Sequence, residues 1–199
     1  MKLFDILNES DASEEAKKKG LDYLSFGRYG KDGKVTHKVV NGKLQPVIKQ
    51  TNPEKFAVKA HGNQMYGSKP YLYHLKKVNE LVIKYGGSKE EQIIAFLHDV
   101  LEDTPVTKEE LSKKFGSKIG HIVDLLSNKS SKEETFKRIR TSKEAVFVKL
   151  CDRLANVSEG TKNNKYRKEQ GLFKQILYRP GEFDNLWKEI ENKLQVNGN

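Results

Sequence analysis

Residues 93–104 read IIAFLHDVLEDT, an apolar run that acquires one histidine and three carboxylates. The preceding SKEE at residues 88–91 is a capping box, which predicts the start of a helix. The run is apolar nearly all round, which places this helix in the interior. On a helix, Asp99, Glu102 and Asp103 stand at i, i+3 and i+4 and share one face. Buried like charges need a positive partner, so this segment predicts a divalent-cation site.

Further candidate ligands lie on two other apolar helices. One helix is predicted to begin near Pro70, and His74 falls on its inward stripe. The other covers residues 145–156, where Asp152 ends an apolar run and Asn156 lies one turn further on the same face. Two imidazoles and two carboxylates are therefore available as ligands. A mixed nitrogen and oxygen set suits Mn, Fe or Zn better than Ca, and the spacing leaves the choice among them open.

Each of these residues also has a simpler interpretation. A lone histidine on an apolar stripe, such as His74, is more often a core residue than a ligand, and Asp152 can pair with Arg153. Taken together on three separate apolar helices, these interpretations require several independent coincidences. The pattern favours a metal site.

The order of these residues resembles that of the HD-domain metal-dependent phosphohydrolases. The local sequence is most similar to the hydrolase domain of the RelA/SpoT proteins and to small stand-alone alarmone hydrolases. The matching segments are HGNQ at 61–64, PYLYH at 70–74, FLHDVLEDT at 96–104 and VKLCDRLAN at 148–156. The resemblance covers residues 52–160 and implies an all-α HD-domain helical bundle.

The resemblance also implies roles for individual residues. His74, His98, Asp99 and Asp152 would hold one Mn²⁺ ion, with Fe and Zn as alternatives. Glu102 and Asp103 match the acidic pair that orients and deprotonates the attacking water, and Asn156 matches a residue that contacts the nucleotide near the ribose and phosphate. The implied reaction is hydrolysis of the 3′-pyrophosphate of (p)ppGpp, which gives GDP or GTP and pyrophosphate. A bound divalent cation lowers the pKa of its water, and a nearby carboxylate takes the proton.

One segment departs from the family pattern. The loop at residues 65–69 is one residue shorter and lacks the arginine that packs on guanine in the family. Tyr66 is a candidate to stack on the base instead, although Met65 and Tyr66 are equally consistent with loop packing. Lys69 and Lys149 are candidates for phosphate contact or ordinary solvated lysines. The competing interpretation is an HD hydrolase that acts on another nucleotide, such as NADPH or a cyclic or deoxynucleotide.

Composition limits the remaining possibilities. The chain is 36% hydrophobic and 32% charged, carries a formal net charge of +10, and has one cysteine, Cys151, which excludes an internal disulfide. No apolar run approaches the roughly 20 residues that span a membrane, and no secretory signal is expected, so we predict a cytoplasmic protein. The basic tract at 162–168 is interpreted as a solvated helix face, which makes nucleic acid an unlikely partner. A basic virion or nucleic-acid-binding protein with a vestigial HD site is the remaining alternative, and the oligomeric state stays open.

Residues 1–50 differ from the helical remainder at 51–199. Turn signals predict a small N-terminal β-ribbon with strands at 34–40 and 43–48. Residues 1–9 form an amphipathic segment, and Leu7-Asn8-Glu9 resembles the cleavage site of phage capsid-targeting peptides. This resemblance adds a hypothesis of a phage-encoded protein packaged in the virion, and the alternative is a frayed helix.

Overall fold

The computed structural model describes residues 3–46 and 51–196. The chain divides into two compact units, Met1–Gln50 and Thr51–Asn199, and each is described by itself. Helices account for most of the described residues, together with a small antiparallel sheet near the N-terminus. The predicted fold class, a helical bundle with a small N-terminal β appendage, is confirmed.

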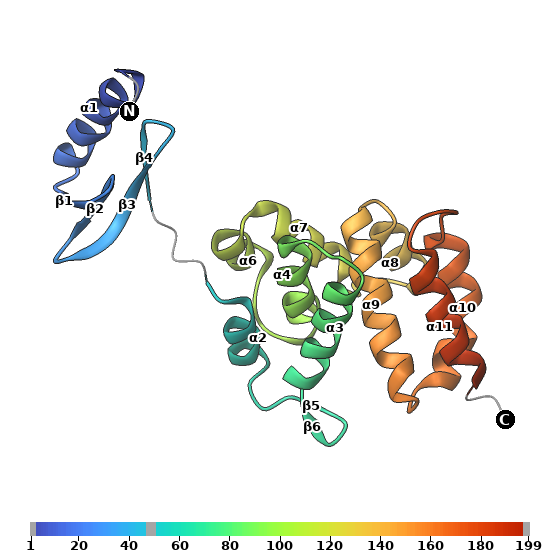
Figure 1. The fold of residues 1–199 in the computed structure, drawn as a ribbon. Coiled ribbons are helices and arrows are strands. Elements are labelled where there is room, and N and C mark those ends of the chain that lie inside the picture. The colour runs from blue at the N-terminus through green and yellow to red at the C-terminus, as the bar shows by residue number, and fades with distance from the viewer. Residues whose placement is uncertain (1–2, 47–50, 197–199) are drawn as a thin grey trace. The chain divides into compact units, whose positions relative to one another are not determined.

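The N-terminal unit consists of one helix and one sheet. Helix α1 (Leu3–Lys18) is followed by four antiparallel strands in the order β1-β2-β3-β4 (Figure 1). Their bounds are Asp22–Ser25, Arg28–Lys31, Lys34–Val40 and Lys43–Pro46. The sequence predicted β3 and β4, although residues 47–48 of the second lie outside the described residues. The ribbon prediction was wrong in missing β1 and β2, and residues 7–9 lie within the longer helix α1.

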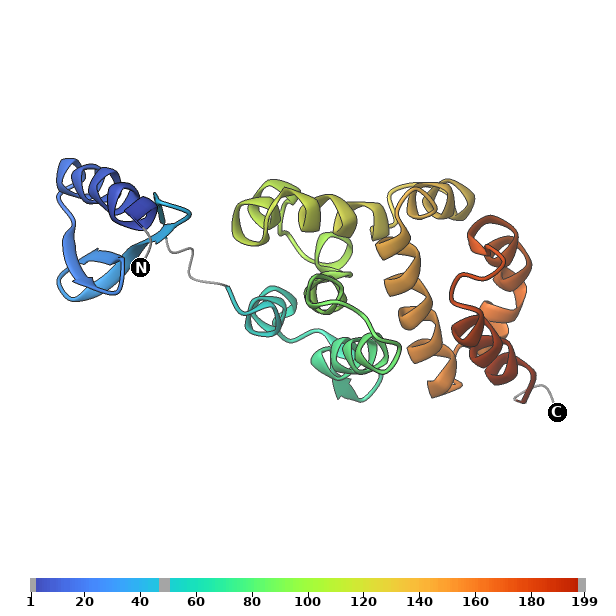
Figure 2. The same cartoon turned by 45° about the horizontal axis from the view of Figure 1, so that its top comes forward.

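The C-terminal unit contains the remaining elements. They are α2 (Pro53–His61), β5 (Met65–Tyr66), β6 (Lys69–Pro70), α3 (Leu72–Lys84), α4 (Lys89–Leu97), α5 (Val100–Asp103), α6 (Lys108–Phe115), α7 (Ser117–Leu126), α8 (Lys132–Ile139), α9 (Lys143–Glu159), α10 (Asn163–Leu177) and α11 (Asp184–Val196). Helix α9 crosses the middle of this unit, with α3 packed on one side and α11 on the other (Figure 2).

Helix α9 is the structural centre of the C-terminal unit because it is buried along most of its length. Its N-terminus is capped by Ser142, whose hydroxyl accepts a hydrogen bond from the backbone N–H of Ala145 at 3.2 Å. Its C-terminus ends at Gly160 in the left-handed conformation, with φ 79°. These signals fix the ends of the helix and therefore the position of Asp152 and Asn156 in its last turns.

Two predicted helix boundaries were wrong. The helix that begins with the capping box at Ser88 does not continue through the acidic residues: α4 ends at Leu97, residues 98 and 99 form a turn, and α5 follows. Pro70 lies in strand β6, paired with Met65, instead of in the opening turn of α3. The short β5–β6 hairpin therefore replaces the first predicted turn of α3.

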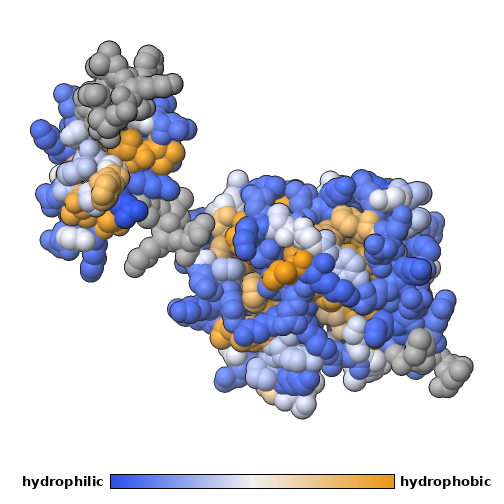
Figure 3. All heavy atoms as spheres, in the orientation of Figure 1, coloured by the Kyte–Doolittle hydropathy of each residue, from blue (hydrophilic) through white to orange (hydrophobic). Residues whose placement is uncertain are grey.

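The surface of the C-terminal unit is mostly hydrophilic on the face shown in Figure 3, with small separate apolar areas. Within residues 3–46 and 51–196, no helix is both long enough and apolar enough to cross a membrane. Trp187 of α11 is buried against Phe173 and Tyr178.

Candidate metal centre

The structure brings the four predicted ligands together from three helical segments. His74 projects from α3, His98 and Asp99 form the α4–α5 turn, and Asp152 projects from α9. The His74 Nε2 atom lies 3.2 Å from Asp152 Oδ1 and 3.7 Å from Asp99 Oδ2. The His98 Nε2 atom lies 2.9 Å from Asp99 Oδ2 and 3.8 Å from Asp152 Oδ1.

The break between α4 and α5 has a direct consequence for this cluster. It places His98 and Asp99 at the end of a buried helix, where both side chains point toward His74. His74, His98 and Asp99 offer ligand atoms that all lie within 4.8 Å of one another. Asp152 joins them from α9 through its Oδ1 atom.

The hydrogen bonding of His98 fits a metal ligand. Its Nδ1 atom lies 2.8 Å from the carbonyl oxygen of Ala95, and a carbonyl only accepts, so Nδ1 carries the proton. The buried Nε2 atom makes no well-aligned hydrogen bond with any described residue, although Asp99 Oδ2 lies 2.9 Å away. A histidine ligand commonly donates its second ring N–H in this way while the other nitrogen faces the metal.

The electrostatics of the cluster favour a positive charge at its centre. Burial opposes protonation of His98, but the carboxylates of Asp99 and Asp152 raise its pKa to about 10. Burial also opposes ionisation of Asp99, and the two histidines nevertheless hold its pKa below the usual range. The cluster thus stabilises either a proton or a cation between imidazoles and carboxylates. Two imidazoles and two carboxylates in this arrangement fit a divalent cation.

Neighbouring side chains hold the two carboxylates in place. The Tyr71 hydroxyl donates to Asp99 Oδ2 at 2.5 Å. Lys149 Nζ donates to Asp152 Oδ2 at 2.8 Å, and Asn156 Nδ2 donates to Asp152 Oδ1 at 2.6 Å. The Asp152 pKa lies well below its usual range because Lys149 and the histidines outweigh its burial. Both carboxylates are therefore fixed in orientation by protein donors.

The predicted acidic pair lies beside this cluster and is exposed to solvent. Asp103 Oδ2 accepts a hydrogen bond from Gln64 Nε2 at 2.9 Å, and Gln64 Oε1 lies 2.7 Å from His61 Nδ1. Glu102 Oε2 accepts a hydrogen bond from the backbone N–H of Asn128 at 2.9 Å. Each carboxylate is thus held by a partner far away in the sequence.

The cluster forms one end of a cleft with a volume of about 610 Å³. The wall of the cleft that faces this cluster comes from α8, α9 and the start of α10. The basic side chains on this wall are Lys132, Lys149, Arg153, Lys162 and Lys165. The basic tract predicted to be a solvated face therefore contributes two lysines to the cleft. A volume of this size is typical of small-molecule sites.

Arg153 is the most buried of the basic residues in the cleft wall. Its guanidinium lies 4.5 Å from the centre of the Tyr166 ring and 4.1 Å from that of Phe173. Its Nη2 atom lies 3.3 Å from Glu169 Oε2, whereas Nη1 is buried without a hydrogen-bond partner among the described residues. A buried, incompletely paired guanidinium in a cleft is suited to an anionic ligand.

All four residues predicted to contact substrate line the cleft. The Tyr66 ring stacks on His74 at 4.7 Å between centroids, and its hydroxyl donates to Asn156 Oδ1 at 2.9 Å. Lys69 lies over the Tyr73 ring, with 3.6 Å between Nζ and the centroid. Lys149 is engaged by Asp152. Tyr66 and Lys149 therefore also contact the candidate ligands: Tyr66 packs on His74, and Lys149 donates a hydrogen bond to Asp152.

Sequence reasoning did not assign a site role to several residues that the structure places here. Tyr71 and Gln64 were each part of a matching motif but were given no role in the site. Arg153 and Lys165 were interpreted as an ion-pair partner and a surface lysine. Their proximity to the ligands in the sequence was the available signal for Tyr71 and Arg153. The HGNQ motif was the signal for Gln64, although it does not indicate the contact with the distant Asp103.

Comparison with known proteins identifies the family of this helical unit. Residues 54–178 match the HD domain family, and the chain belongs to this family. The guanosine-3′,5′-bis(diphosphate) 3′-pyrophosphohydrolase of Aquifex aeolicus (strain VF5) is 30% identical over 158 residues, which are 71% of this chain and 22% of that protein. The GTP pyrophosphokinase rsh of Brucella ovis is 32% identical over 116 residues, 51% of this chain and 16% of that protein. The chain thus spans about a fifth of the length of these relatives.

Solved structures show the same fold. A metazoan ortholog of SpoT that hydrolyses ppGpp superimposes with a TM-score of 0.64 and 20% identity, over 77% of this chain and 98% of that one. The protein lmo0812 of Listeria monocytogenes EGD-e gives a TM-score of 0.50 with 23% identity, over 64% of this chain and 98% of that one. The resemblance to the RelA/SpoT hydrolase domain that the sequence motifs indicated is confirmed.

Proposed function

We infer that this chain is a Mn²⁺-dependent (p)ppGpp 3′-pyrophosphohydrolase. The observation that carries this proposal is the convergence of His74, His98, Asp99 and Asp152 beside a pair of exposed carboxylates, in one cleft with a basic wall. The relatives of this chain include a protein named guanosine-3′,5′-bis(diphosphate) 3′-pyrophosphohydrolase. Fe and Zn are the alternative ions, since the donor set accepts all three.

The residues of the cleft suit hydrolysis of a phosphate ester. The cation would be held by the four ligands, where it supplies Lewis acidity and lowers the pKa of a bound water. Glu102 and Asp103 are proposed to orient this water and take its proton. Gln64 holds one oxygen of Asp103, which limits the directions in which that carboxylate can accept a proton.

The opposite wall is proposed to bind the substrate. Lys162, Lys165 and Arg153 supply positive charge where a polyphosphate nucleotide would extend away from the metal. Asn156 is proposed to contact the ribose and phosphate, because it lies between Asp152 and Tyr66. Lys69 and Lys149 remain proposed phosphate contacts.

The second candidate is an HD hydrolase that acts on a different nucleotide. It is favoured by the β5–β6 hairpin, which lacks an arginine and packs Tyr66 against His74. Because the Tyr66 ring already stacks on His74, it would contact a nucleobase differently from the arginine that packs on guanine in the family. A vestigial site is disfavoured, because every ligand side chain converges on the same point.

The test is hydrolysis of ppGpp by metal-stripped protein to which Mn²⁺ is restored. Wild-type protein is compared with Asp99→Ala and Glu102→Ala, and with Glu109→Ala as a matched control. Glu109 is an exposed acidic residue in α6 that does not line the cleft. Pyrophosphate release that requires Mn²⁺, is lost in both site variants and persists in the control would support the proposal.

Two other results would contradict it in different ways. Stoichiometric metal binding without turnover of ppGpp would leave the metal site in place and reject this substrate, and a panel of NADPH, cyclic nucleotides and deoxynucleotides would then identify the alternative. Absence of metal binding by the wild-type protein would reject the metal site itself.

A further inference from the structure

The sheet of the N-terminal unit has one covered face and one open face. Tyr29 and Leu44 belong to the small core formed with Ala12 and Ala16 of α1, so their side of the sheet faces the helix. The opposite side is defined by strand register. Arg28 pairs with Lys38, and Lys38 pairs with Gln45, so these three side chains share the open face.

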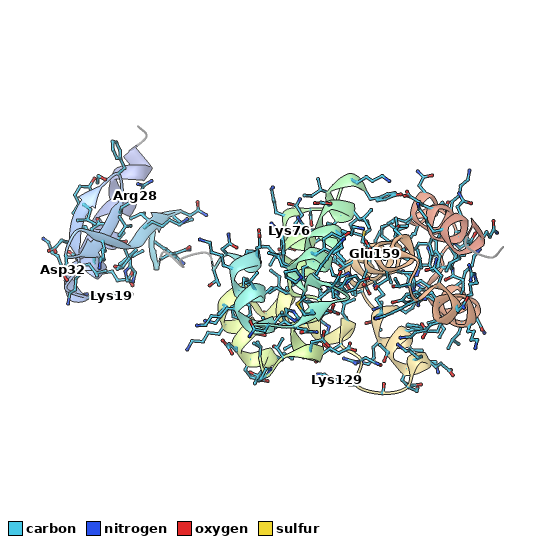
Figure 4. All side chains as sticks on the ribbon, turned by 90° about the horizontal axis from the view of Figure 1, so that it is seen from below. Lys19, Arg28, Asp32, Lys76, Lys129 and Glu159 are labelled. Atoms are coloured by element: carbon cyan, nitrogen blue, oxygen red, sulfur yellow. The ribbon has the colours of Figure 1, made fainter. Side chains whose placement is uncertain are left out.

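The open face carries cations for which no ion pair is found among side chains 11–45. Lys43 pairs with Val40, two residues along each strand from the Lys38–Gln45 pair, and so lies on the same face. Arg28, Lys38 and Lys43 are all exposed, and Figure 4 labels Arg28 on this unit. Among side chains 11–45, the ion pair found joins Lys19 to Glu15 on α1. Like charges directly opposite on neighbouring strands, as in the Arg28–Lys38 pair, destabilise a sheet unless an anion binds them.

The three hairpin turns of this sheet share one backbone geometry but differ in the type of residue at their first central position. Asp32-Gly33 and Asn41-Gly42 have positive φ at both residues, 51° and 71° in the first and 50° and 73° in the second. These are the residue types that such two-residue turns favour. The β1–β2 turn has the same geometry, with φ 43° and 66°, but its first residue is Phe26.

Phe26 is unfavourable for the stability of the unit by itself. A bulky residue at positive φ is strained, and burial does not offset this strain, because Phe26 is 94% exposed. The same chain uses Asp and Asn at the equivalent positions. An exposed aromatic ring is therefore presented at the tip of a hairpin, two residues before the cation Arg28.

We propose that the open face of this sheet binds single-stranded nucleic acid. Arg28, Lys38 and Lys43 contact the phosphates, and Phe26 stacks on an unpaired base. A single strand matches both features, because its backbone is anionic and its bases present flat apolar faces. A duplex would match the cations alone, since its bases are already stacked. This binding does not depend on the proposed hydrolase activity.

The test uses the full chain and fluorescence anisotropy with labelled oligo-dT and oligo-rU of about 15 nucleotides at low salt. Phe26→Asn installs the favoured turn residue, so we expect an unchanged or higher melting temperature together with about tenfold weaker binding. Asp32→Asn, at the equivalent position of the neighbouring turn, is the matched control and leaves binding unchanged.

A charge variant tests the phosphate contacts separately. The double variant Arg28→Gln with Lys38→Gln removes two proposed contacts and should reduce the slope of log affinity against log salt by about 1.4. Lys17→Gln with Lys18→Gln removes the same charge from exposed positions on α1 and is expected to change the slope far less. The rate of nucleotide hydrolysis should be the same as wild type in all four variants: Phe26→Asn, Asp32→Asn and the two double variants.

Several outcomes would overturn the proposal. Absence of oligonucleotide binding at low salt would reject it. Binding that survives both Phe26→Asn and the Arg28–Lys38 double variant would assign the interaction to another surface, such as the lysines of α10. Equal binding of a duplex, insensitive to Phe26→Asn, would reject the stacking role and the preference for single strands.

Discussion

Single side chains next to the candidate ligands determine how those ligands are held. Tyr71 is the clearest case, because its hydroxyl donates to Asp99 Oδ2 while its ring stacks on His61 at 4.4 Å between centroids. Burial and the nearby charges of Asp99 and Asp103 raise the pKa of this hydroxyl, so it stays a donor. Tyr71 thus links the candidate ligand Asp99 to His61 and Gln64, and Gln64 donates a hydrogen bond to Asp103.

Tyr71→Phe should weaken metal binding without disturbing the fold. The substitution keeps the ring and removes the donor to Asp99, and loss of such a partner typically lowers metal affinity about 10–100-fold. Calorimetric titration with Mn²⁺ measures the change. Tyr85→Phe is the matched control, because the Tyr85 hydroxyl donates to Glu189 and does not line the cleft. Equal metal affinity in the two variants would show that Tyr71 does not orient Asp99.

Two lysines of α10 allow a matched test of the basic wall. Lys165 lines the cleft, whereas Lys168 lies on the same helix, is exposed and does not line it. If the proposed substrate extends along this wall, Lys165→Ala should raise KM for ppGpp roughly tenfold, the typical effect of losing one charge-assisted hydrogen bond. The kcat should change little, and Lys168→Ala should change neither. A KM effect of the same size in both variants would indicate a general charge effect.

At the scale of helices and strands, the sequence predicted features that are local in the chain. The predicted capping box at Ser88 and Glu91 is present, because it is set by residues three positions apart. The candidate ligands were predicted because three apolar helices each carried an unexpected polar residue. These signals do not depend on how the helices are arranged.

The features that were missed depend on contacts between distant segments. Gln64 and Asp103 are 39 residues apart, and neither neighbourhood indicates the other. The break after Leu97 was missed because the sequence stays helix-compatible through Asp103. The backbone at residues 98 and 99 also remains in the helical region of φ and ψ. Only the packing of His98 and Asp99 toward α3 and α9 distinguishes this turn from a continuous helix.

The contact between α6 and α7 gives a prediction whose sign depends on packing. Helix propensity predicts that Gly120→Ala stabilises α7 by about 1 kcal/mol. A Cβ at Gly120, however, would lie 2.2 Å from Ser112 Oγ and 3.2 Å from Ser112 Cα on α6. We therefore expect a loss of about 1–3 kcal/mol in the free energy of unfolding.

Gly171 provides the control for this substitution. It also lies in a helix, α10, and a Cβ there would meet no atom within 4 Å. Gly171→Ala should therefore raise the free energy of unfolding by about 0.5–1 kcal/mol. Denaturation by urea, followed by circular dichroism, measures both changes. Stabilisation by Gly120→Ala would show that α6 and α7 are further apart than described.

The whole molecule is organised as two units that each have a separate core. The N-terminal core is small and joins α1 to its own sheet, whereas the main core belongs entirely to residues 57–194. All four candidate ligands lie in the C-terminal unit. Ligand binding stabilises the folded state to which it is coupled, by about 2.7 kcal/mol at a hundredfold excess over Kd. The two units should therefore respond separately to metal.

Hydrogen exchange measured by peptide mass spectrometry tests this separation. We expect Mn²⁺ to increase protection in peptides from residues 51–196 and to leave peptides from 3–46 unchanged. Gly30→Ala should destabilise only the N-terminal unit. A Cβ at this position would lie 1.9 Å from the Lys34 carbonyl oxygen and would disrupt the pairing of β2 with β3. Exchange would then rise only in the N-terminal peptides, with metal affinity unchanged. Protection of both units by Mn²⁺, or loss of metal binding in Gly30→Ala, would show that the units are energetically coupled.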